Sequence, residues 1–489
     1  GYELRAAYID LTPVGGPARV AIDTELMEHT IAVKNTIEPG VKTLNIVLVD
    51  EFGNRHNSTV DVEVKSRQIK DDADFDWDEA RIYFMLTDRF SNSEKPEGMP
   101  SNELSESYHG GDFQGVINNL DYLEELGINT IWITPIVDNI DDGMEMANGD
   151  KRYGYHGYWA KDFTKIDENL GDKETFATLI DEAHDRGMKI MVDVVLNHAG
   201  YGMNNADQFE GMIRENPVAT DDILGELDGL PDFKTEDPIV RDRIIQWQVD
   251  WITELDKFTT KNNNTIDYFR VDTVKHVDNT TWNAFKNEIT KVKPDFKMIG
   301  EWYGASVNST GDQLRTGRMD SLLDFNFKGQ AERFINGNIS QVEKELADRN
   351  GKIDNTAMLG QFLSSHDEDG FLVARAKGDE GLFKVAAALQ ITAKGQPVIY
   401  YGEELGQSGL MHDDSVDRYY DENRYNLDWS IANDENDMLT HYKKLLNIRE
   451  DYSDVFSKGT RQHIAGDDES GYSVFARTYG NEQIFVGLN

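Results

Sequence analysis

Apolar and polar residues alternate one by one through much of the first part of the chain. Val60, Val62 and Val64 are separated by charged residues, and residues 44–48 follow the same pattern. Alternation with a period of two is typical of half-buried β-strands. The polar segment 50–54 between the two runs predicts a turn, so we expect residues 1–69 to form a β-domain.

This first domain resembles a small immunoglobulin-like β-sandwich. We favour a role as a spacer or packing domain, and carbohydrate binding by the same domain remains the alternative. The acidic segment 70–79 that follows has the composition of a linker.

From Arg81 onward the pattern changes to short apolar runs separated by segments with helical spacing. In one such segment Leu120, Leu123 and Leu126 recur every three or four residues, and Gly127 ends it. The apolar runs that read as strands are residues 81–88, 130–135, 189–195, 267–272, 297–301, 321–325, 358–363 and 396–401. Eight strands alternating with helices predict an α/β fold, a (β/α)8 TIM barrel over residues 70–455.

Two segments fall outside this alternation. The stretch from about residue 198 to 238 follows the third strand and is too long for a simple loop, which predicts an inserted subdomain. After a last helix near residues 439–448, short strands at 471–479 and 483–488 predict the start of a C-terminal β-domain, residues 456–489. The barrel is therefore expected between two β-domains, the second of them partial.

Composition excludes several classes of function. Lysine and arginine total 49 and aspartate and glutamate 90, a net charge of −41 spread along the whole chain. Nucleic acid and anionic membrane surfaces both need a basic partner, so neither is expected. The chain has no run of about 18 apolar residues, which excludes membrane insertion. The absence of cysteine excludes disulfides, thiol catalysis and cysteine-bound metal.

Residues 269–276 end an aromatic-rich apolar run in a cluster of charges. Because side chains alternate along a strand, Arg270 and Asp272 share one face and Val271 points to the other. A neighbouring guanidinium favours the ionised carboxylate, and an ionised, oriented carboxylate is a competent nucleophile. Taken alone, the pair is more simply explained as an ordinary ion pair at a strand end.

In a TIM barrel, polar residues at the C-terminal ends of the strands form the active site. Beyond the arginine–aspartate pair of the fourth strand, the third strand ends near His198, the fifth ends in Glu301 and the seventh leads to His366 and Asp367. These strand ends meet at one mouth of the barrel. We therefore predict that three carboxylates, an arginine and two histidines converge there.

These residues give the chain a resemblance to the α-amylase family of glycoside hydrolases, over about residues 81–448. The motifs that carry the resemblance are Asp193…Asn197-His198, Arg270-x-Asp272-x-x-Lys275-His276, Glu301 and His366-Asp367, with support from residues 87–90, 110–115, 155–159 and 230–232. The resemblance implies a TIM barrel that hydrolyses α-glucosidic bonds.

The resemblance implies a retaining mechanism with two carboxyl groups about 5–5.5 Å apart. Asp272 would attack the anomeric carbon, and Glu301 would protonate the leaving oxygen and then activate water, which requires a raised pKa. Asp367 would stabilise the oxocarbenium-like transition state. The side chains expected to bind substrate are Arg270, which also aligns the nucleophile; His198 and His366, which bond sugar hydroxyls; Tyr158, which stacks on the sugar; and Lys275 and His276 on the leaving-group side.

Structural calcium (Ca²⁺) is the cofactor that the resemblance implies. Calcium prefers several oxygen ligands in a loose geometry. Asn197 and Asp232 match calcium-bridging positions between the barrel and the inserted subdomain. Backbone carbonyls of His276 and of a residue near Ile223 would complete the shell.

The resemblance also raises a second calcium ion near Asn92, Gly110 and Asp112. Glu94 and the loop between these residues depart from the related pattern. A turn closed by hydrogen bonds from the aspartate and asparagine side chains explains these residues as well.

The expected activity is endo-acting, retaining hydrolysis of α-1,4-glucosidic bonds in starch and maltooligosaccharides. The pair Lys275-His276 resembles the version in α-amylases and cyclodextrin glucanotransferases, and residues 226–232 contain none of the aromatic residues that glucanotransferases place in the cleft. One alternative is a maltooligosaccharide-forming or transglycosylating enzyme active on cyclodextrins or pullulan. Another is a glucan-binding protein without catalysis, which the presence of all three carboxylates disfavours.

The remaining expectations concern the state of the protein. Because a starch polymer does not enter cells, we expect a secreted, extracellular protein, with tethering to the cell surface as a variant of this. The chain begins with Gly1, which suggests a mature or trimmed form. We also expect a monomer.

Overall fold

Eight parallel strands close into a barrel in the computed structural model, which describes residues 4–24, 31, 33, 37, 40–64, 75–94, 106–145, 151–253, 260–262, 264–354, 358–413, 418–419 and 422–489. The order around the barrel is β11-β12-β13-β14-β15-β16-β5-β6. The strands are β5 (Ile82–Met85), β6 (Thr130–Ile133), β11 (Lys189–Val194), β12 (Tyr268–Val271), β13 (Lys297–Gly300), β14 (Ser321–Asp324), β15 (Met358–Phe362) and β16 (Gln396–Tyr400). The predicted TIM barrel and all eight predicted strand positions are confirmed.

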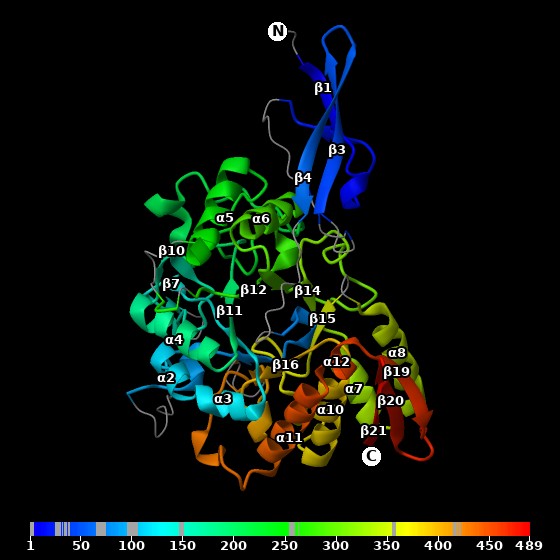
Figure 1. The fold of residues 1–489 in the computed structure, drawn as a ribbon. Coiled ribbons are helices and arrows are strands. Elements are labelled where there is room, and N and C mark those ends of the chain that lie inside the picture. The colour runs from blue at the N-terminus through cyan, green and yellow to red at the C-terminus, as the bar shows by residue number, and fades with distance from the viewer. Residues whose placement is uncertain are drawn as a thin grey trace.

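Helices follow the strands and surround the barrel (Figure 1). They are α1 (Thr87–Phe90), α2 (Phe113–Asn118), α3 (Leu120–Leu126), α4 (Lys173–Asp185), α5 (Pro238–Thr253), α6 (Asn279–Val292), α7 (Phe327–Ile335), α8 (Ile339–Lys352), α9 (Phe371–Ala374), α10 (Glu380–Thr392), α11 (Asp437–Asp451) and α12 (Ser453–Lys458). The helix predicted before Gly127 forms as two pieces that meet at Asn119. Gly127 ends α3 with a φ of 91°, a conformation that glycine adopts at little cost.

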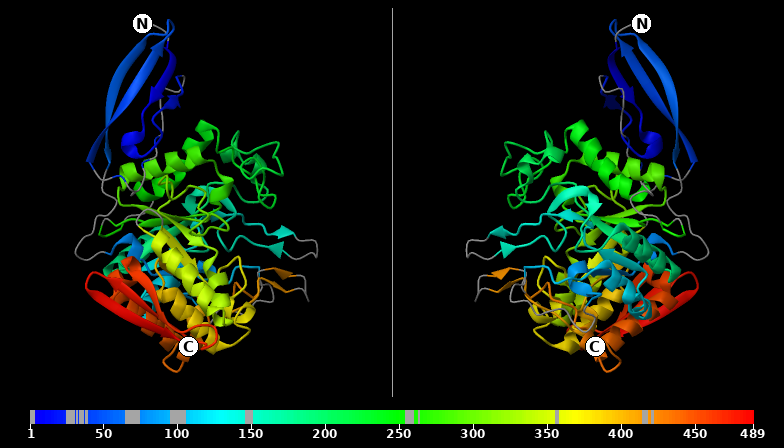
Figure 2. Two further views of the ribbon diagram at one scale, coloured as in Figure 1. Left: turned by 90° about the vertical axis from the view of Figure 1, so that its right-hand side faces the viewer. Right: turned by 90° about the vertical axis from the view of Figure 1, so that its left-hand side faces the viewer.

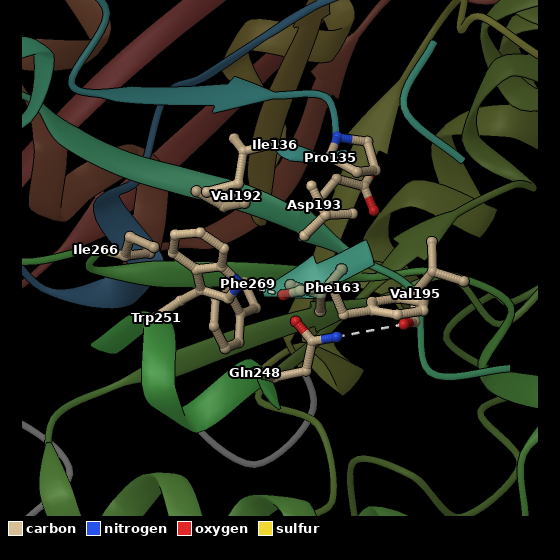
Figure 3. Close-up of a pocket in the computed structure, with 12 residues that line it drawn as sticks. Pro135, Ile136, Phe163, Val192, Asp193, Val195, Gln248, Trp251, Ile266 and Phe269 are labelled. Carbon is tan, nitrogen blue, oxygen red and sulfur yellow. Dashed lines mark hydrogen bonds between the residues drawn. The ribbon is translucent and has the colours of Figure 1, made fainter. Parts of the chain in front are cut away.

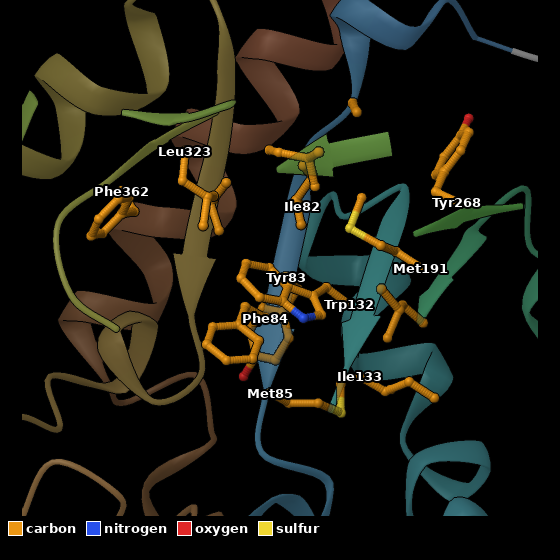
Figure 4. Packing of buried hydrophobic residues seen from close by; sticks show 14 of the residues in the cluster. Ile82, Tyr83, Phe84, Met85, Trp132, Ile133, Met191, Tyr268, Leu323 and Phe362 are labelled. Carbon is orange, nitrogen blue, oxygen red and sulfur yellow. The ribbon is translucent and has the colours of Figure 1, made fainter. Parts of the chain in front are cut away.

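Large side chains from neighbouring strands fill the barrel. Figure 4 shows Phe84 of β5 beside Trp132 of β6, and these rings stack with centroids 3.8 Å apart. Nearly every residue of the eight strands is buried, because parallel strands are covered by side chains on one face and by helices on the other. This double burial explains why the strands appear in the sequence as continuous apolar runs.

The outer face of the strands that carry the site packs against α5. Figure 3 shows Trp251 and Gln248 of α5 near Val192 of β11 and Phe269 of β12. The Gln248 amide also donates to the carbonyl of Val195, at 3.4 Å. With these alternate residues packed outward, the residues between them face the inside of the barrel.

Two insertions rise from the barrel. The first follows β6 and was not predicted: β7 (Val137–Asn139) pairs with β10 (Ala160–Ile166), and β8 (Met144–Glu145) pairs with β9 (Lys151–Arg152). The second is the predicted stretch after β11, which contains two short 3-10 helices, Met203–Asn205 and Asp207–Phe209. Isolated bridges join His198 to Asp232 and Ile213 to Phe233, so this second insertion folds back on its own start.

A four-stranded antiparallel sheet forms the N-terminal domain, in the order β2-β1-β3-β4. Its strands are β1 (Leu4–Ile9), β2 (Val20–Ile22), β3 (Gly40–Asp50) and β4 (Arg55–Val64). In Figures 1 and 2 the sheet projects from the barrel beyond α5 and α6. The predicted β-domain is confirmed, and the turn predicted at 50–54 lies between Asp50, the last residue of β3, and Arg55, the first residue of β4. The described residues supply this one sheet, so the pairing of two sheets as in a sandwich stays a prediction.

Three antiparallel strands form the sheet at the C-terminal end: β19 (Thr460–Ala465), β20 (Ser473–Tyr479) and β21 (Glu482–Leu488). The last two match the predicted strands, and β19 was missed. Two strands of two residues each, β17 (His412–Asp413) and β18 (Arg418–Tyr419), pair in antiparallel fashion. None of the helices in the described part of the chain combines the length and apolar character that crossing a bilayer requires.

Candidate active site

Arg270 links three carboxylates at the C-terminal end of the barrel. Its Nη1 donates to Asp272 Oδ1 at 2.7 Å and to both carboxylate oxygens of Asp193 at 3.0 Å. Its Nη2 lies 2.9 Å from Glu301 Oε2. The side chain is only 1% exposed. Burial alone would lower the pKa of Arg270, but these carboxylates outweigh it and raise the pKa well above its usual value.

The register of the strands explains why these groups meet. Asp193 lies opposite Arg270 in the pair β11–β12, and Val271 lies opposite Gly300 in the pair β12–β13. Asp272 and Glu301 come directly after these paired residues, and the Glu301 N–H donates to the Val271 carbonyl at 2.8 Å. The predicted shared face of the arginine and the aspartate is confirmed, and the structure adds contacts to the other two carboxylates.

Thr273 turns the chain sharply just after the predicted nucleophile. Its φ is 49°, in the left-handed region that residues with a β-branched side chain rarely adopt. In this conformation its N–H donates to Glu301 Oε2 at 3.1 Å. Glu301 is therefore held by a backbone amide on one strand end and by the guanidinium beside it.

Glu301 is suited to hold a proton at neutral pH. Burial raises its pKa to about 8, and the negative charges of Asp272 and Asp367 add to the rise while Arg270 opposes it. The same surroundings pair Asp272 directly with a cation. The site therefore places a proton donor and a charge-paired carboxylate on adjacent strand ends, which is the division of labour that glycoside hydrolysis needs.

Asp367 lies at the open side of the mouth, with 42% of its side chain exposed. It accepts from Arg424 Nη2 at 2.9 Å and lies 3.1 Å from His366 Nε2. Burial would raise the pKa of Asp367, but the His366 ring and the Arg424 guanidinium outweigh it and lower the pKa. Sequence reasoning missed Arg424, because no motif links it to a residue 57 positions earlier.

The residues predicted to bind sugar line the same mouth. The Tyr158 hydroxyl donates to Asp193 at 2.7 Å, and its ring stacks on His366 with centroids 5.4 Å apart. His198 Nε2 lies 3.2 Å from the Tyr158 carbonyl. Burial lowers the pKa of both histidines, to about 4 for His366, so both rings are neutral near pH 7.

Lys275 and His276 lie on the side where Glu301 is found. Lys275 Nζ lies 5.5 Å from the ring centre of Trp302, the residue after Glu301. His276 Nδ1 lies 2.9 Å from the carbonyl oxygen of Asp222, next to Ile223 in the inserted stretch. The structure therefore places Lys275 beside the residue that follows Glu301, and it joins His276 to the insertion after β11.

The predicted calcium positions contain two oxygens that are suited to a metal. Within the described residues Asn197 Oδ1 and Asp232 Oδ1 are buried and have no hydrogen-bond partner. A buried oxygen without a partner is costly, and coordination would satisfy both. The other carboxylate oxygen of Asp232 accepts from Arg214 Nε at 2.7 Å. Among the described residues, no three or more histidine, aspartate or glutamate side chains are grouped so that they could hold a metal ion. The predicted calcium shell does not require such a group, because it consists largely of amide and carbonyl oxygens. The residues present fit calcium.

The second predicted calcium position forms a hydrogen-bonded turn. Asp112 Oδ1 accepts from the Gly115 N–H at 2.6 Å, as the cap of α2, and its Oδ2 accepts from the Ser93 hydroxyl at 2.7 Å. Asn92 Oδ1 accepts from the Glu94 N–H at 2.9 Å. These contacts match the turn interpretation, and they add no oxygen without a partner.

The chain is similar to several characterised enzymes. It is 30% identical to a cyclomaltodextrinase of Geobacillus thermopakistaniensis over 448 residues, which is 85% of this chain and 69% of that one. It is 28% identical to neopullulanase 2 of Thermoactinomyces vulgaris, covering 84% of this chain and 69% of that one. An intracellular maltogenic amylase of Bacillus subtilis is 27% identical over 434 residues, 84% of this chain and 68% of that one.

The prediction of a secreted protein is wrong in the light of these relatives. It assumed that the substrate is a starch polymer, which cannot enter a cell. The relatives include an enzyme described as intracellular, and the others bear the names cyclomaltodextrinase and neopullulanase rather than starch-degrading amylase. Polymer size is therefore no guide to location in this group of enzymes.

Solved structures and a family model agree on the family. An α-amylase from Geobacillus thermoleovorans superimposes with a TM-score of 0.70 at 28% identity, covering 84% of this chain and 87% of that one. The model of the α-amylase catalytic domain matches residues 84–222 and 223–465, well over half of the chain. The chain belongs to the α-amylase family of glycoside hydrolases.

Proposed function

We propose that this protein is a retaining hydrolase of α-glucosidic bonds, with Asp272 as nucleophile and Glu301 as acid and base. The observation that carries the proposal is the single guanidinium of Arg270 bound to both carboxyl groups. It aligns them on adjacent strand ends and stabilises the negative charge of the nucleophile. Proton transfer then falls to Glu301, whose pKa is raised by burial.

The reaction proceeds in two displacements. First, a carboxylate oxygen of Asp272 forms a bond to the anomeric carbon while the glycosidic bond breaks, and the Glu301 proton passes to the leaving oxygen. In the second step water attacks the anomeric carbon, gives its proton to Glu301 and releases Asp272. Asp367, held by Arg424, accepts hydrogen bonds from sugar hydroxyls and stabilises the positive charge of the transition state.

Short and cyclic maltodextrins are the substrates we favour. The support is the similarity to a cyclomaltodextrinase, a neopullulanase and a maltogenic amylase, each matched over about five-sixths of this chain. This replaces the expectation of endo-acting hydrolysis of starch as the first choice. Endo-hydrolysis remains the second candidate, favoured by the pair Lys275-His276 and by the likeness to the thermophilic α-amylase structure.

Calcium is proposed as a structural ion between the barrel and the insertion after β11. Asn197 and Asp232 would hold it through their buried oxygens without partners, with backbone carbonyls of His276 and of the chain near Ile223. The ion would supply positive charge that keeps the insertion against the barrel. Arg214 would keep the Asp232 carboxylate oriented through its contact to the second oxygen.

A time course of products decides between the two substrate classes. Wild type and Asp272→Asn are incubated with β-cyclodextrin, pullulan and soluble starch, and the products are separated by chromatography. Faster cleavage of cyclodextrin than of starch, with maltose as the main product, supports the first proposal. A ladder of linear oligosaccharides from starch with slow cyclodextrin cleavage supports the second. Turnover that survives in Asp272→Asn would exclude the assigned nucleophile.

A further inference from the structure

An ion pair lies in the wall of the catalytic cleft, apart from the groups assigned above. The Lys328 ammonium group contacts the carboxylate of Glu368, and these side chains are only 12% and 17% exposed. Glu368 directly follows Asp367, and Lys328 lies in the first turn of α7. The cavity that contains Glu301 and Asp367 is also lined by Glu368, Tyr303, Phe325 and Phe362.

Aromatic rings surround the lysine. Its Nζ lies 5.5 Å from the ring centre of Phe325 and 5.2 Å from that of Phe362, distances at which a ring face attracts a cation. Burial lowers the pKa of Lys328 to about 8, the nearby Arg375 adds to the decrease, and the negative charge of Asp369 opposes it. The lysine is therefore held in a site that is poor in water, with the carboxylate of Glu368 as its ion-pair partner.

A buried ion pair of this kind is a costly way to fill a wall. Removing two charges from water costs more than their attraction usually returns, and apolar residues of similar volume are often at least as stable. Charged groups that are retained in a cleft despite this cost are candidates for contact with a ligand. The neighbouring rings show that this wall accommodates apolar side chains.

The wall lies on the side from which the leaving group departs. Glu301 must face the leaving oxygen to protonate it. Tyr303, two residues further along, is 65% exposed and packs on Phe325 with ring centres 5.1 Å apart. The rings therefore extend from the acid catalyst to the ion pair, along the surface that the sugar beyond the cleaved bond would cover.

We propose that the Glu368 carboxylate accepts hydrogen bonds from hydroxyls of the sugar on the leaving-group side, and that Lys328 holds the carboxylate in position. Adjacent sugar hydroxyls offer two donors, which matches the two oxygens of one carboxylate. The same contact would hold a second sugar when it replaces water as the acceptor, so the pair would favour transfer to sugar. This inference rests on the proposed glucan hydrolysis.

The test compares two substrates that differ only beyond the cleaved bond. Maltotetraose offers a sugar on the leaving-group side, and 4-nitrophenyl α-maltoside offers an aromatic ring without hydroxyl groups at the corresponding place. The first variant is Glu368→Gln, which keeps the shape of the side chain and removes its charge. The second combines Lys328→Met with Glu368→Gln, so that neither charge of the ion pair is left buried without the other. Because a hydrogen bond to a charged group is involved, we expect kcat/KM for maltotetraose to fall about tenfold in both variants. For the aryl substrate it should stay within about twofold, and transfer to added maltose should fall relative to hydrolysis.

A matched control uses a buried lysine–acid pair at the other end of the barrel. The side chains of Lys286 and Asp320 are 7% and 5% exposed and contact each other. Asp320 is the residue directly before β14. Lys286→Met with Asp320→Asn is expected to lower Tm without changing the ratio of kcat/KM for maltotetraose to kcat/KM for the aryl substrate. If kcat/KM fell equally for both substrates in the Glu368 variants, or fell for neither, the ratio of the two values would be unchanged and the inference would be overturned. Absence of glucan turnover in wild type would instead refute the proposed function.

Discussion

Arg424 Nη2 donates to Asp367 Oδ1 at 2.9 Å, while Nε of the same guanidinium donates to the His366 carbonyl at 2.8 Å. One side chain thus fixes both the carboxylate and the backbone that presents it. Arg424 is nearly buried, whereas Asp367 is half-exposed. The orientation of Asp367, the third carboxylate proposed for catalysis, therefore depends on an arginine from a distant part of the chain.

Replacement of Arg424 by methionine should lower kcat more than it raises KM. The Asp367 carboxylate would lose a hydrogen bond to a charged group, a loss of about 1.5–3 kcal/mol, or roughly ten- to a hundredfold in rate. Steady-state kinetics on β-cyclodextrin checks this, with Tm as the measure of folding. Arg424→Lys keeps the charge but not both hydrogen bonds, and it should restore only part of the rate. An unchanged kcat in the methionine variant would contradict the orienting role.

The rate should depend on pH through Glu301. The acid must be protonated to donate, and burial raises its pKa to about 8, assisted by the charges of Asp272 and Asp367. We therefore expect kcat/KM to persist through neutral pH and to fall as pH rises past about 8. A pH profile over a range in which the protein stays folded measures this. A decline that begins near pH 5, as for an ordinary glutamic acid, would contradict the assignment.

The same carboxyl group predicts how stability changes with pH. A folded-state pKa above the unfolded value of 4.5 means that the folded protein holds the proton more tightly. This contribution to the free energy of unfolding is complete below about pH 4.5 and is lost as pH rises through about 8. Glu301→Gln has no such titration. The Tm of this variant relative to the Tm of wild type should therefore rise as pH increases from about 4.5 to about 8. Parallel curves for the two proteins would show that Glu301 titrates normally.

Removal of calcium should destabilise the insertion after β11. Removal of the proposed ion by EDTA would leave Asn197 Oδ1 and Asp232 Oδ1 buried without partners. The Tm should therefore fall by several degrees. In Asp232→Asn with Asn197→Ala, EDTA should have little further effect. Calorimetry with and without added calcium measures both. The same Tm for wild type in EDTA and in calcium would refute the proposed site.

The sequence was sufficient for the barrel because each strand is buried on both faces and appears as a short apolar run. The carboxylates at strand ends were equally readable, since their position after an apolar run places them at the mouth. Arg424 was not, because its importance comes from a contact across 57 residues. The hairpin β8–β9 has two residues in each strand, too few for any pattern. The break between α2 and α3 at Asn119 interrupts a helical period that continues almost unchanged on both sides.

The most direct test of the account is to trap the covalent glycosyl-enzyme. Glu301→Gln is incubated with α-maltosyl fluoride, whose leaving group needs no protonation, and the intact mass and the peptide map are recorded. We expect an increase of one maltosyl unit, located on the peptide that contains Asp272 and absent in Glu301→Gln with Asp272→Asn. A protein that hydrolyses the fluoride with no adduct on Asp272, or that carries the sugar on another residue, would contradict the account.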